Sequence, residues 1–320
     1  MGRTLVAGGA GFLGAHLVRR LATKTQVVVV DDLSAGQTSV LEEFKALGVT
    51  TLVMDCRETK ALVAALQSGD TLDRIIHLAA NSDIRRSALE PEIELNKTFE
   101  TTVSLLAVAA ALGCNEFIFA SSSAVYGDWP GQRLSELTPC RPISYYGAAK
   151  LASEAFIAAA VHNQPLAACI LRLPNVIGSG MTHGVLVDFV EKLRRDPRVL
   201  SILGDGSQRK SFLLVDEVVD VMVLPGIVPT LGVSTYNVAV DDNLSIQEVA
   251  RIVLRELRLK DVTISCGTSP NGWVGDVRWY LMDGSSLALQ GWRAQRSSSE
   301  AVTAAIRQLG GLEGFASAKA

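Results

Sequence analysis

The chain has 320 residues, of which 48% are hydrophobic and 20% charged, and its formal net charge is -3. This apolar fraction is too high for a disordered or fibrous protein, and the length allows about two domains. Acidic and basic residues nearly balance, so there is no cationic excess to bind nucleic acid or anionic lipid. The five cysteines are scattered without a CxxC pair, so neither a disulfide framework nor a metal site is expected.

The first half of the chain alternates short apolar runs with longer amphipathic segments. Several runs are apolar at consecutive positions, which is typical of parallel strands covered on both faces. Repeated strand-helix-strand units predict right-handed crossovers, and hence an α/β fold with a doubly wound parallel sheet of the Rossmann type. We expect strands at Thr4–Ala7, Gln26–Val30, Thr50–Val53, Arg74–Leu78, Glu116–Ala120 and Ala167–Leu173, and helices at Phe12–Leu21, Thr59–Gln67, Glu92–Leu112 and Tyr146–His162.

The second half, after about Pro174, has more glycines and shorter segments. We expect helices at Val185–Arg195, Ser245–Leu257 and near Ser299–Leu309, and a strand near Val262–Ser265. These patterns predict that residues 1–175 form the Rossmann domain, with a segment near 210–240 returning to it. Residues 176–320 would mainly form a smaller mixed α/β domain that binds substrate.

No charged segment followed by an apolar run and a cleavage site opens the chain. The most apolar stretch, Val103 to Leu112, covers ten residues, whereas a membrane span requires about 20. We therefore expect a soluble, cytoplasmic protein with no membrane partner.

A glycine-rich turn joins the first predicted strand to the first predicted helix. Gly8, Gly11 and Gly14 have the spacing GxxGxxG. Without Cβ atoms the turn can be tight, a pyrophosphate can approach closely, and the helix can pack on the strand. The pyrophosphate would meet the free N–H groups at the start of the helix, around Phe12 and Leu13.

Asp31 and Asp32 end the second predicted strand, with Asp31 lying 17 positions after Gly14. A carboxylate at this point accepts the ribose hydroxyls of NAD and repels the 2′-phosphate of NADP. No Lys or Arg follows closely that would bind such a phosphate, so the predicted cofactor is NAD.

Two further strand ends fit a dinucleotide. Asp55 and Cys56 follow the third strand, where a carboxylate can reach the adenine amino group. The fourth strand ends in small or apolar residues that let a cofactor lie against the backbone, namely Leu78, Ala79 and Ala80.

Tyr146 and Lys150 form a Tyr-x-x-x-Lys pair on a predicted helix, and this spacing puts both side chains on one face. An ammonium close to a phenol stabilises phenolate and is expected to lower the tyrosine pKa toward working pH. The pair would then accept the proton of an alcohol that is being oxidised. Ser121, Ser122 and Ser123 close the fifth strand, where a hydroxyl can hydrogen-bond the same reacting oxygen.

Taken in this order, the motifs resemble those of the extended short-chain dehydrogenase/reductase family, in its nucleotide-sugar epimerase/dehydratase branch. The matching stretches are GGAGFLG, DDLS, HLAA, SSSAVYG, PISYYGAAKLASE, LRLPNVIG, GDGSQRKSFLLV and GDVRWYLMD. Within the branch, the chain is most similar to the UDP-glucose 4-epimerase type. The resemblance implies tightly held NAD, a UDP-sugar substrate and a catalytic triad of Ser or Thr, Tyr and Lys.

Carried over to this chain, the resemblance makes Tyr146 the base and Lys150 its electrostatic partner and a ribose ligand. The catalytic serine falls on Ser122, with Ser123 as the open alternative. Asn96 would support the active-site backbone from the long helix that follows the fourth strand.

The resemblance also implies substrate-binding residues. Asn175 matches an asparagine that binds the diphosphate or the sugar, and Arg278 matches an arginine that contacts the diphosphate. Where family members have Arg-Asp-Phe, this chain has Lys210-Ser211-Phe212. Either Arg209 or Lys210 would supply that positive charge.

The residues before Val-Tyr-Gly distinguish reactions within the family. Dehydratases have Thr-Asp-Glu there and decarboxylases Thr-Ser-Glu, whereas this chain has Ser122-Ser123-Ala124. Without a carboxylate, elimination of water lacks its general base, so reversible hydride transfer at C4 of UDP-glucose or UDP-galactose is favoured. The alternatives are epimerisation of UDP-glucuronate or an N-acetylated sugar, and a non-catalytic NAD-sensing protein.

Family members usually dimerise by packing two long helices of each subunit into a four-helix bundle. Here those helices would be Glu92–Leu112 and Tyr146–His162. A homodimer is therefore expected, with an outward face of small and apolar residues at Val103, Leu106, Ala107, Ala110 and Ala111.

Overall fold

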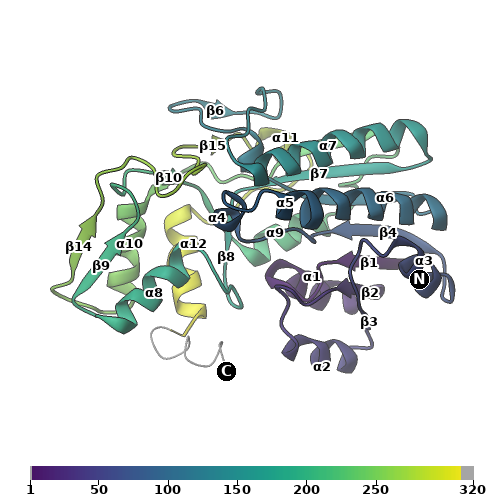
Figure 1. Ribbon diagram of the computed structural model, residues 1–320, viewed down its shortest axis with the longest axis horizontal. Helices are drawn as coiled ribbons and strands as arrows, with labels where there is room; N and C mark the ends of the chain where they lie inside the picture. The colour runs from purple at the N-terminus through teal and green to yellow at the C-terminus, as the bar shows by residue number, and fades with distance from the viewer. Residues whose placement is uncertain (1, 311–320) are drawn as a thin grey trace. The chain divides into compact units, whose positions relative to one another are not determined.

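The computed structural model describes residues 2–310, which form two compact units (Figure 1). The first unit comprises residues 2–125, 144–172 and 219–236, and the second comprises residues 126–143, 173–218 and 237–310. The chain therefore crosses between the units several times, and each unit is built from segments far apart in sequence.

A seven-stranded sheet forms the centre of the first unit, in the order β12-β7-β5-β4-β1-β2-β3. Neighbouring strands from β3 to β5 are parallel, so that Leu5 of β1 lies opposite Val28 of β2 and Ile75 of β4. The chain leaves β1 toward β3 and returns to β4 on the other side, and ligands of such sheets bind at this reversal. The strands are β1 (Arg3–Ala7), β2 (Gln26–Asp31), β3 (Thr50–Val53), β4 (Leu72–His77), β5 (Glu116–Ser122), β7 (Ala167–Leu173) and β12 (Val233–Asn237).

Helices pack on this sheet, and Figure 1 shows two of them, α6 and α7, running side by side. The core between sheet and helices is fully buried at Leu5, Ile75, Leu105, Phe117 and Ile157. The helices of this unit are α1 (Phe12–Ala22), α2 (Ser39–Ala46), α3 (Thr59–Gln67), α4 (Ile84–Ser87), α5 (Glu92–Glu94), the π-helix η1 (Leu95–Phe99), α6 (Glu100–Leu112), the 3-10 turn η2 (Ser123–Val125) and α7 (Tyr145–Asn163).

The predicted Rossmann arrangement is confirmed, and all six expected strands are present. Among the elements of this unit that the sequence did not predict are β12 and α2. The strand β12 reads VSTYN and is only partly buried, so it lacks the continuous apolar run of a central strand. The helix α2 has eight residues and buries only Val40 and Phe44 against the unit, which leaves too short a pattern to detect.

A continuous helix covers Glu92–Leu112 as expected, but it is not a regular α-helix. It is three consecutive pieces, α5, η1 and α6, with a wide turn in which the Glu100 N–H bonds the Leu95 carbonyl. Beside this turn, the Thr101 hydroxyl donates to the Lys97 carbonyl at 3.1 Å, and such back-bonding disturbs regular helix geometry. Leu106, expected on the outer face of α6, instead lies in the core with 5% of its surface exposed.

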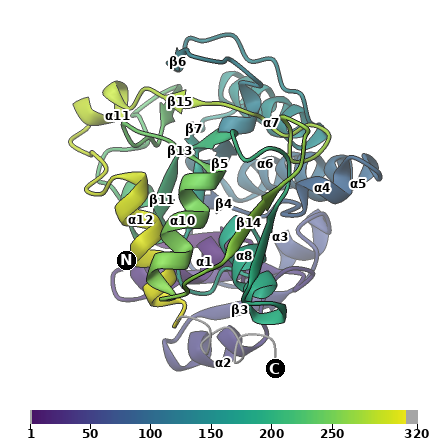
Figure 2. The ribbon, with the colours of Figure 1, turned by 90° about the vertical axis from the view of Figure 1, so that its left-hand side faces the viewer.

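The second unit consists of small paired strands and amphipathic helices (Figure 2). Helix α10 packs beside both α8 and α12. At the start of α10 the Ser245 hydroxyl accepts the Glu248 N–H at 3.1 Å, and the Glu248 carboxylate accepts the Ser245 N–H at 2.7 Å, so the predicted capping box is present.

The parallel pairs of this unit are β8 (Asn175–Ile177) with β11 (Phe212–Leu214), β9 (Val199–Ile202) with β14 (Thr263–Cys266), and β6 (Arg133–Leu134) with β15 (Leu281–Met282). The antiparallel pair is β10 (Arg209–Lys210) with β13 (Leu244–Ser245). The helices are α8 (Val185–Arg195), α10 (Ile246–Glu256), α11 (Ser285–Leu289) and α12 (Ser298–Gln308), and α9 (Val215–Met222) joins the two units in sequence. Between residues 2 and 310, no helix combines the length and apolarity that crossing a bilayer requires.

Candidate active site

The glycine-rich turn lies between β1 and α1, at the carboxyl edge of the sheet. Helix α1 begins after Gly11, whose backbone is extended, and it has neither a side-chain cap nor an acidic residue in its first turn. The backbone N–H groups of its first turn are therefore available to bind an anion such as a pyrophosphate. Gly8 has a positive φ of 79°, and a Cβ on Gly14 would lie 2.2 Å from the Gly8 carbonyl oxygen. The protein's own packing thus requires these two glycines.

Gly11 is different, because a Cβ there would meet only the Gly8 carbonyl oxygen, at an ordinary 3.4 Å. Nothing in the surrounding chain requires Gly11, whereas a group bound against the turn would. This surface fits a pyrophosphate that approaches the backbone closely.

Asp31 connects the turn to the end of β2. Its carboxylate accepts the Ala10 N–H and the Leu33 N–H, each at 2.9 Å. Burial raises the pKa of Asp31, while these backbone donors act in the opposite direction. The carboxylate is thereby held in a fixed orientation at the strand end, where a ribose is expected.

The other predicted cofactor residues also lie in the first unit. The Leu78 N–H bonds the Ala7 carbonyl at 2.9 Å, and a Cβ on Gly8 would lie 2.7 Å from the Ala79 nitrogen, so the ends of β1 and β4 adjoin the glycine turn. Ala80 follows Ala79 directly. Cys56 is buried, and burial raises the pKa of its thiol to about 12, which makes it a packing group rather than a nucleophile.

The Ser122 hydroxyl, at the end of β5, lies close enough to Tyr146, near the start of α7, to lower the pKa of that phenol. Lys150, one turn along α7, donates to the Ala120 carbonyl at 2.7 Å and lies 5.8 Å from the centre of the Tyr146 ring. The structure therefore brings together the three residues expected to be catalytic. Ser123 is buried in the following 3-10 turn.

The expected lowering of the Tyr146 pKa is not observed in the protein alone. Burial and the nearby carboxylate of Glu94 raise the pKa of Tyr146 to about 12. The Ser122 hydroxyl acts in the opposite direction, but its effect is smaller. Burial also lowers the pKa of Lys150 to about 8. Desolvation is the largest cause of both shifts, and it disfavours the charged form of each group.

Glu94 is a buried acidic residue near Tyr146 and Lys150 that the sequence analysis did not single out. Its side chain is buried on α5, where it accepts the Asn81 amide at 2.8 Å and the Thr98 hydroxyl at 2.6 Å. Its charge raises the pKa of both Tyr146 and Lys150. Asn81 lies 13 residues before Glu94 and Thr98 lies four residues after it. Asn81 therefore reaches the cluster only because the loop after β4 folds back.

A buried polar network joins helix α7 to strands β5 and β7. Glu154 forms an ion pair with Arg172 of β7 at 2.7 Å and accepts the Ser121 hydroxyl. Within residues 2–310 both members of this pair are less than a tenth exposed, so their charges are matched against each other rather than against solvent. Ser121 thus has a supporting place in the core, which distinguishes it from Ser122.

The predicted substrate residues of the second unit are arranged as follows. The Lys210 ammonium bonds Asp276 at 2.8 Å and the Val277 carbonyl, and Arg209 bonds Asn243 at 2.8 Å. Both cations therefore already have partners inside their own unit.

The pKa of the Asp205 carboxyl is lowered, mainly by hydrogen bonds from Ser207 and to a smaller extent by the charge of Arg278. Arg278 itself is exposed. Asn175 donates its amide to the Tyr280 hydroxyl at 2.9 Å. Of the three cations considered in this unit, Arg278 is exposed, Arg209 is partly exposed and Lys210 is buried.

Comparison with known proteins gives the family. A model described as the NAD-dependent epimerase/dehydratase family matches residues 4–239. The chain belongs to this family. A UDP-glucose 4-epimerase of Mycolicibacterium smegmatis is 30% identical over 315 residues, which cover 95% of this chain and 97% of that protein.

Solved structures of family members agree. A UDP-galactose 4-epimerase has a TM-score of 0.81 and 34% identity, covering 96% of this chain and 98% of that one. MoeE5 in complex with UDP-glucuronic acid and NAD has a TM-score of 0.83 and 27% identity, covering 98% and 99%. The protein is thus an NAD-dependent enzyme of the nucleotide-sugar epimerase family, and the glycine turn with Asp31 fits NAD as its cofactor.

Proposed function

We propose that this family member is a UDP-sugar 4-epimerase that interconverts UDP-glucose and UDP-galactose. The observation that carries the proposal is the position of the Lys150 ammonium, 5.8 Å from the centre of the Tyr146 ring and bonded to the Ala120 carbonyl, two residues before Ser122. A proton acceptor, a hydroxyl that orients the same oxygen and an adjacent cation are what reversible oxidation of an alcohol requires.

In this mechanism, bound NAD supplies a hydride acceptor for C4 and later returns the hydride. Tyr146 takes the proton of the C4 hydroxyl, and Ser122 hydrogen-bonds the same oxygen so that it points at Tyr146. Lys150, held by the Ala120 carbonyl, stabilises the phenolate form of Tyr146 that accepts this proton. After the keto-sugar has rotated, the opposite face of C4 would receive the hydride, and Tyr146 returns the proton to the C4 oxygen.

Loss of water from the sugar is disfavoured by the residues beside Ser122. Ser123 and Ala124 follow it and carry no carboxylate. The nearby carboxylate of Glu94 is buried and accepts hydrogen bonds from Asn81 and Thr98. It is therefore placed to influence charge rather than to remove a proton from the sugar.

UDP-glucuronate is the second candidate substrate. The solved relative MoeE5 binds UDP-glucuronic acid together with NAD and covers nearly the whole chain. On either substrate the proposed proton transfer is the same, so the two candidates differ only in the group attached to C5.

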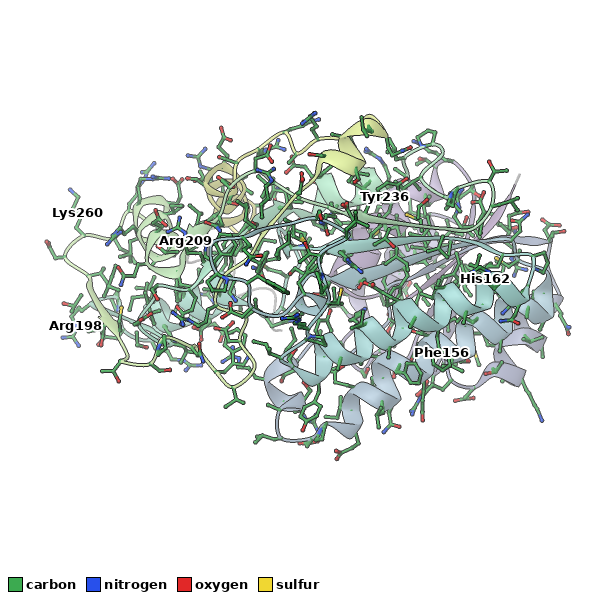
Figure 3. All side chains as sticks on the ribbon, turned by 90° about the horizontal axis from the view of Figure 1, so that it is seen from above. Phe156, His162, Arg198, Arg209, Tyr236 and Lys260 are labelled. Atoms are coloured by element: carbon green, nitrogen blue, oxygen red, sulfur yellow. The ribbon has the colours of Figure 1, made fainter. Side chains whose placement is uncertain are left out.

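We further propose a homodimer through the outer faces of α6 and α7. On α6 the exposed side chains are small or apolar at Val103, Ala107, Ala110 and Ala111. On α7 they are Ala148, Ala155, Phe156 and Ala159, and Figure 3 shows Phe156 at the outer edge of this helix. Recurrence at three- and four-residue intervals makes a continuous apolar face on each helix. A cytoplasmic location stays a prediction of the sequence.

The deciding experiment is a product assay with the purified protein. UDP-glucose and UDP-glucuronate are incubated separately without added cofactor, and the configuration at C4 is read by NMR. We expect UDP-galactose from the first, whereas turnover of UDP-glucuronate alone would replace the substrate and keep the mechanism.

The mechanism itself is tested with Tyr146→Phe, and Tyr145→Phe serves as the matched control because Tyr145 is 54% exposed on the same helix. Removing the proton acceptor should lower kcat by about 10²- to 10⁴-fold, while the control retains activity. Equal activity of the two variants would refute the assigned role of Tyr146.

A further inference from the structure

A cluster of charges links the ends of β2 and β3 to the π-helix η1 within the first unit. Lys97 on η1 bonds the carboxylate of Asp32, and its ammonium lies 3.6 Å from the Asp55 carboxylate. Arg57 also donates to this carboxylate, with its Nη2 at 2.8 Å from Oδ2. Lys97 is thus placed between two carboxylates that both belong to the predicted adenosine side of the NAD site.

Both carboxylates are negatively charged at neutral pH. Burial acts to raise the pKa of Asp32, but hydrogen bonds from Lys97 and Ser34 lower it on balance. Hydrogen bonds from Arg57 hold the pKa of Asp55 at about 2. With Asp31 nearby, three acidic side chains meet at the sheet edge that must accept an anionic dinucleotide, and Lys97 together with Arg57 offsets part of their charge.

The position of Lys97 depends on the irregular turn described above. Single π-turns inside helices are frequent at functional sites because they redirect side chains. Here the turn places Lys97 beside Asp32, which follows β2 and lies 65 positions earlier in the chain. A partly exposed ion pair contributes little to stability, so stability alone gives no reason for this placement.

We propose that Lys97 is a positioning residue of the NAD site, which holds Asp32 and Asp55 in place for the adenosine half of NAD and offsets their repulsion of the cofactor. The side chain would act through the two carboxylates and take no part in the transfer of hydride or proton. Its loss should therefore appear in how fast NAD leaves the protein.

The test measures release of NAD from the purified, NAD-loaded protein after dilution, with the free cofactor quantified over time. Lys97→Met should release NAD about tenfold faster than the unmodified protein, because truncating one member of a charge cluster acts mainly on dissociation. Lys97→Arg should restore slow release. Lys60→Met, which removes an exposed lysine from α3, is the matched control and should leave the rate unchanged.

A role through the carboxylates is separated from mere packing by a double-mutant cycle. In an Asp32→Asn background, Lys97→Met should accelerate release by a smaller factor than in the unmodified protein. High salt should also shrink the difference in release rate between Lys97→Met and the unmodified protein. At 1 M ionic strength the Debye length is only about 3 Å, so interactions between charges farther apart are largely screened.

The proposal is overturned if Lys97→Met releases NAD at the normal rate. It also fails if Lys97→Arg behaves like Lys97→Met, or if the two substitutions act independently, because packing would then account for the effect. Should Lys97→Met not fold, Lys97→Gln takes its place, and melting of each NAD-loaded variant establishes that the fold is intact.

Discussion

Burial shifts the pKa values of Tyr146 and Lys150 in opposite directions, to about 12 and about 8. Each shift disfavours a charge, so the protein by itself favours neutral phenol and weakens the hold of Lys150 on its proton. Glu94 opposes the second effect, because its negative charge raises the pKa of Lys150. The same carboxylate raises the pKa of Tyr146 and so makes the base harder to form.

These signs predict the effect of Glu94→Gln on the pH dependence of kcat/KM. Without the carboxylate, the pKa values of Tyr146 and Lys150 should both fall. The rise in rate as Tyr146 loses its proton and the decline as Lys150 loses its charge should then both move to lower pH. The measurement is a full pH profile with UDP-glucose, or with whichever nucleotide sugar the protein turns over.

Glu92→Gln is the matched control for this experiment, because Glu92 lies on the same short helix with its side chain exposed. Its profile should coincide with that of the unmodified protein. A shift of Glu94→Gln to higher pH, or equal shifts in both variants, would contradict the assigned role of Glu94.

Among the elements, the β1-α1 turn separates glycines that the fold needs from one that the ligand needs. A methyl group on Gly14 would overlap backbone atoms at 2.2 to 2.8 Å, whereas one on Gly11 fits at 3.4 Å. Gly11 also has a φ of -74°, which alanine adopts without strain.

Gly14→Ala is therefore expected to destabilise the protein by several kcal/mol, in the range of backbone overpacking and strain. Gly11→Ala should leave the free energy of unfolding of the NAD-stripped protein, measured by urea titration, within about 0.5 kcal/mol of normal. The same variant should bind NAD more weakly in calorimetric titration. Undiminished NAD affinity in Gly11→Ala would mean that the pyrophosphate does not approach this part of the turn.

Element boundaries show how far local patterns reach. The capping box at Ser245 was readable because both partners stand three residues apart. The π-turn between α5 and α6 was not, since the residues from Glu92 to Leu112 include neither glycine nor proline to mark an irregularity. Local propensity predicts that a helix exists there, while packing decides its geometry.

For the whole molecule, the apolar faces of α6 and α7 predict a dimer that a single charge can disrupt. Ala107→Glu places a carboxylate at the centre of the exposed α6 face, where burial without a partner would be costly. We expect dimers of the unmodified protein and monomers of this variant in sedimentation velocity at micromolar concentration.

Ala46→Glu provides the control, since Ala46 is an exposed alanine at the end of α2, away from the proposed face. It should sediment like the unmodified protein. A monomeric unmodified protein would rule out the proposed interface.

The sequence by itself determined the parallel α/β sheet, the glycine turn, the strand-end carboxylates and the Tyr-Lys pair, because each depends on residues at most a few positions apart or on repeated local patterns. Only the tertiary structure decided that Glu94 faces the catalytic pair, that Glu154 pairs with Arg172, and that Lys97 reaches Asp32 across 65 residues. No spacing rule links such residues. Their proximity results from the order in which strands and helices pack, which the chain specifies only as a whole.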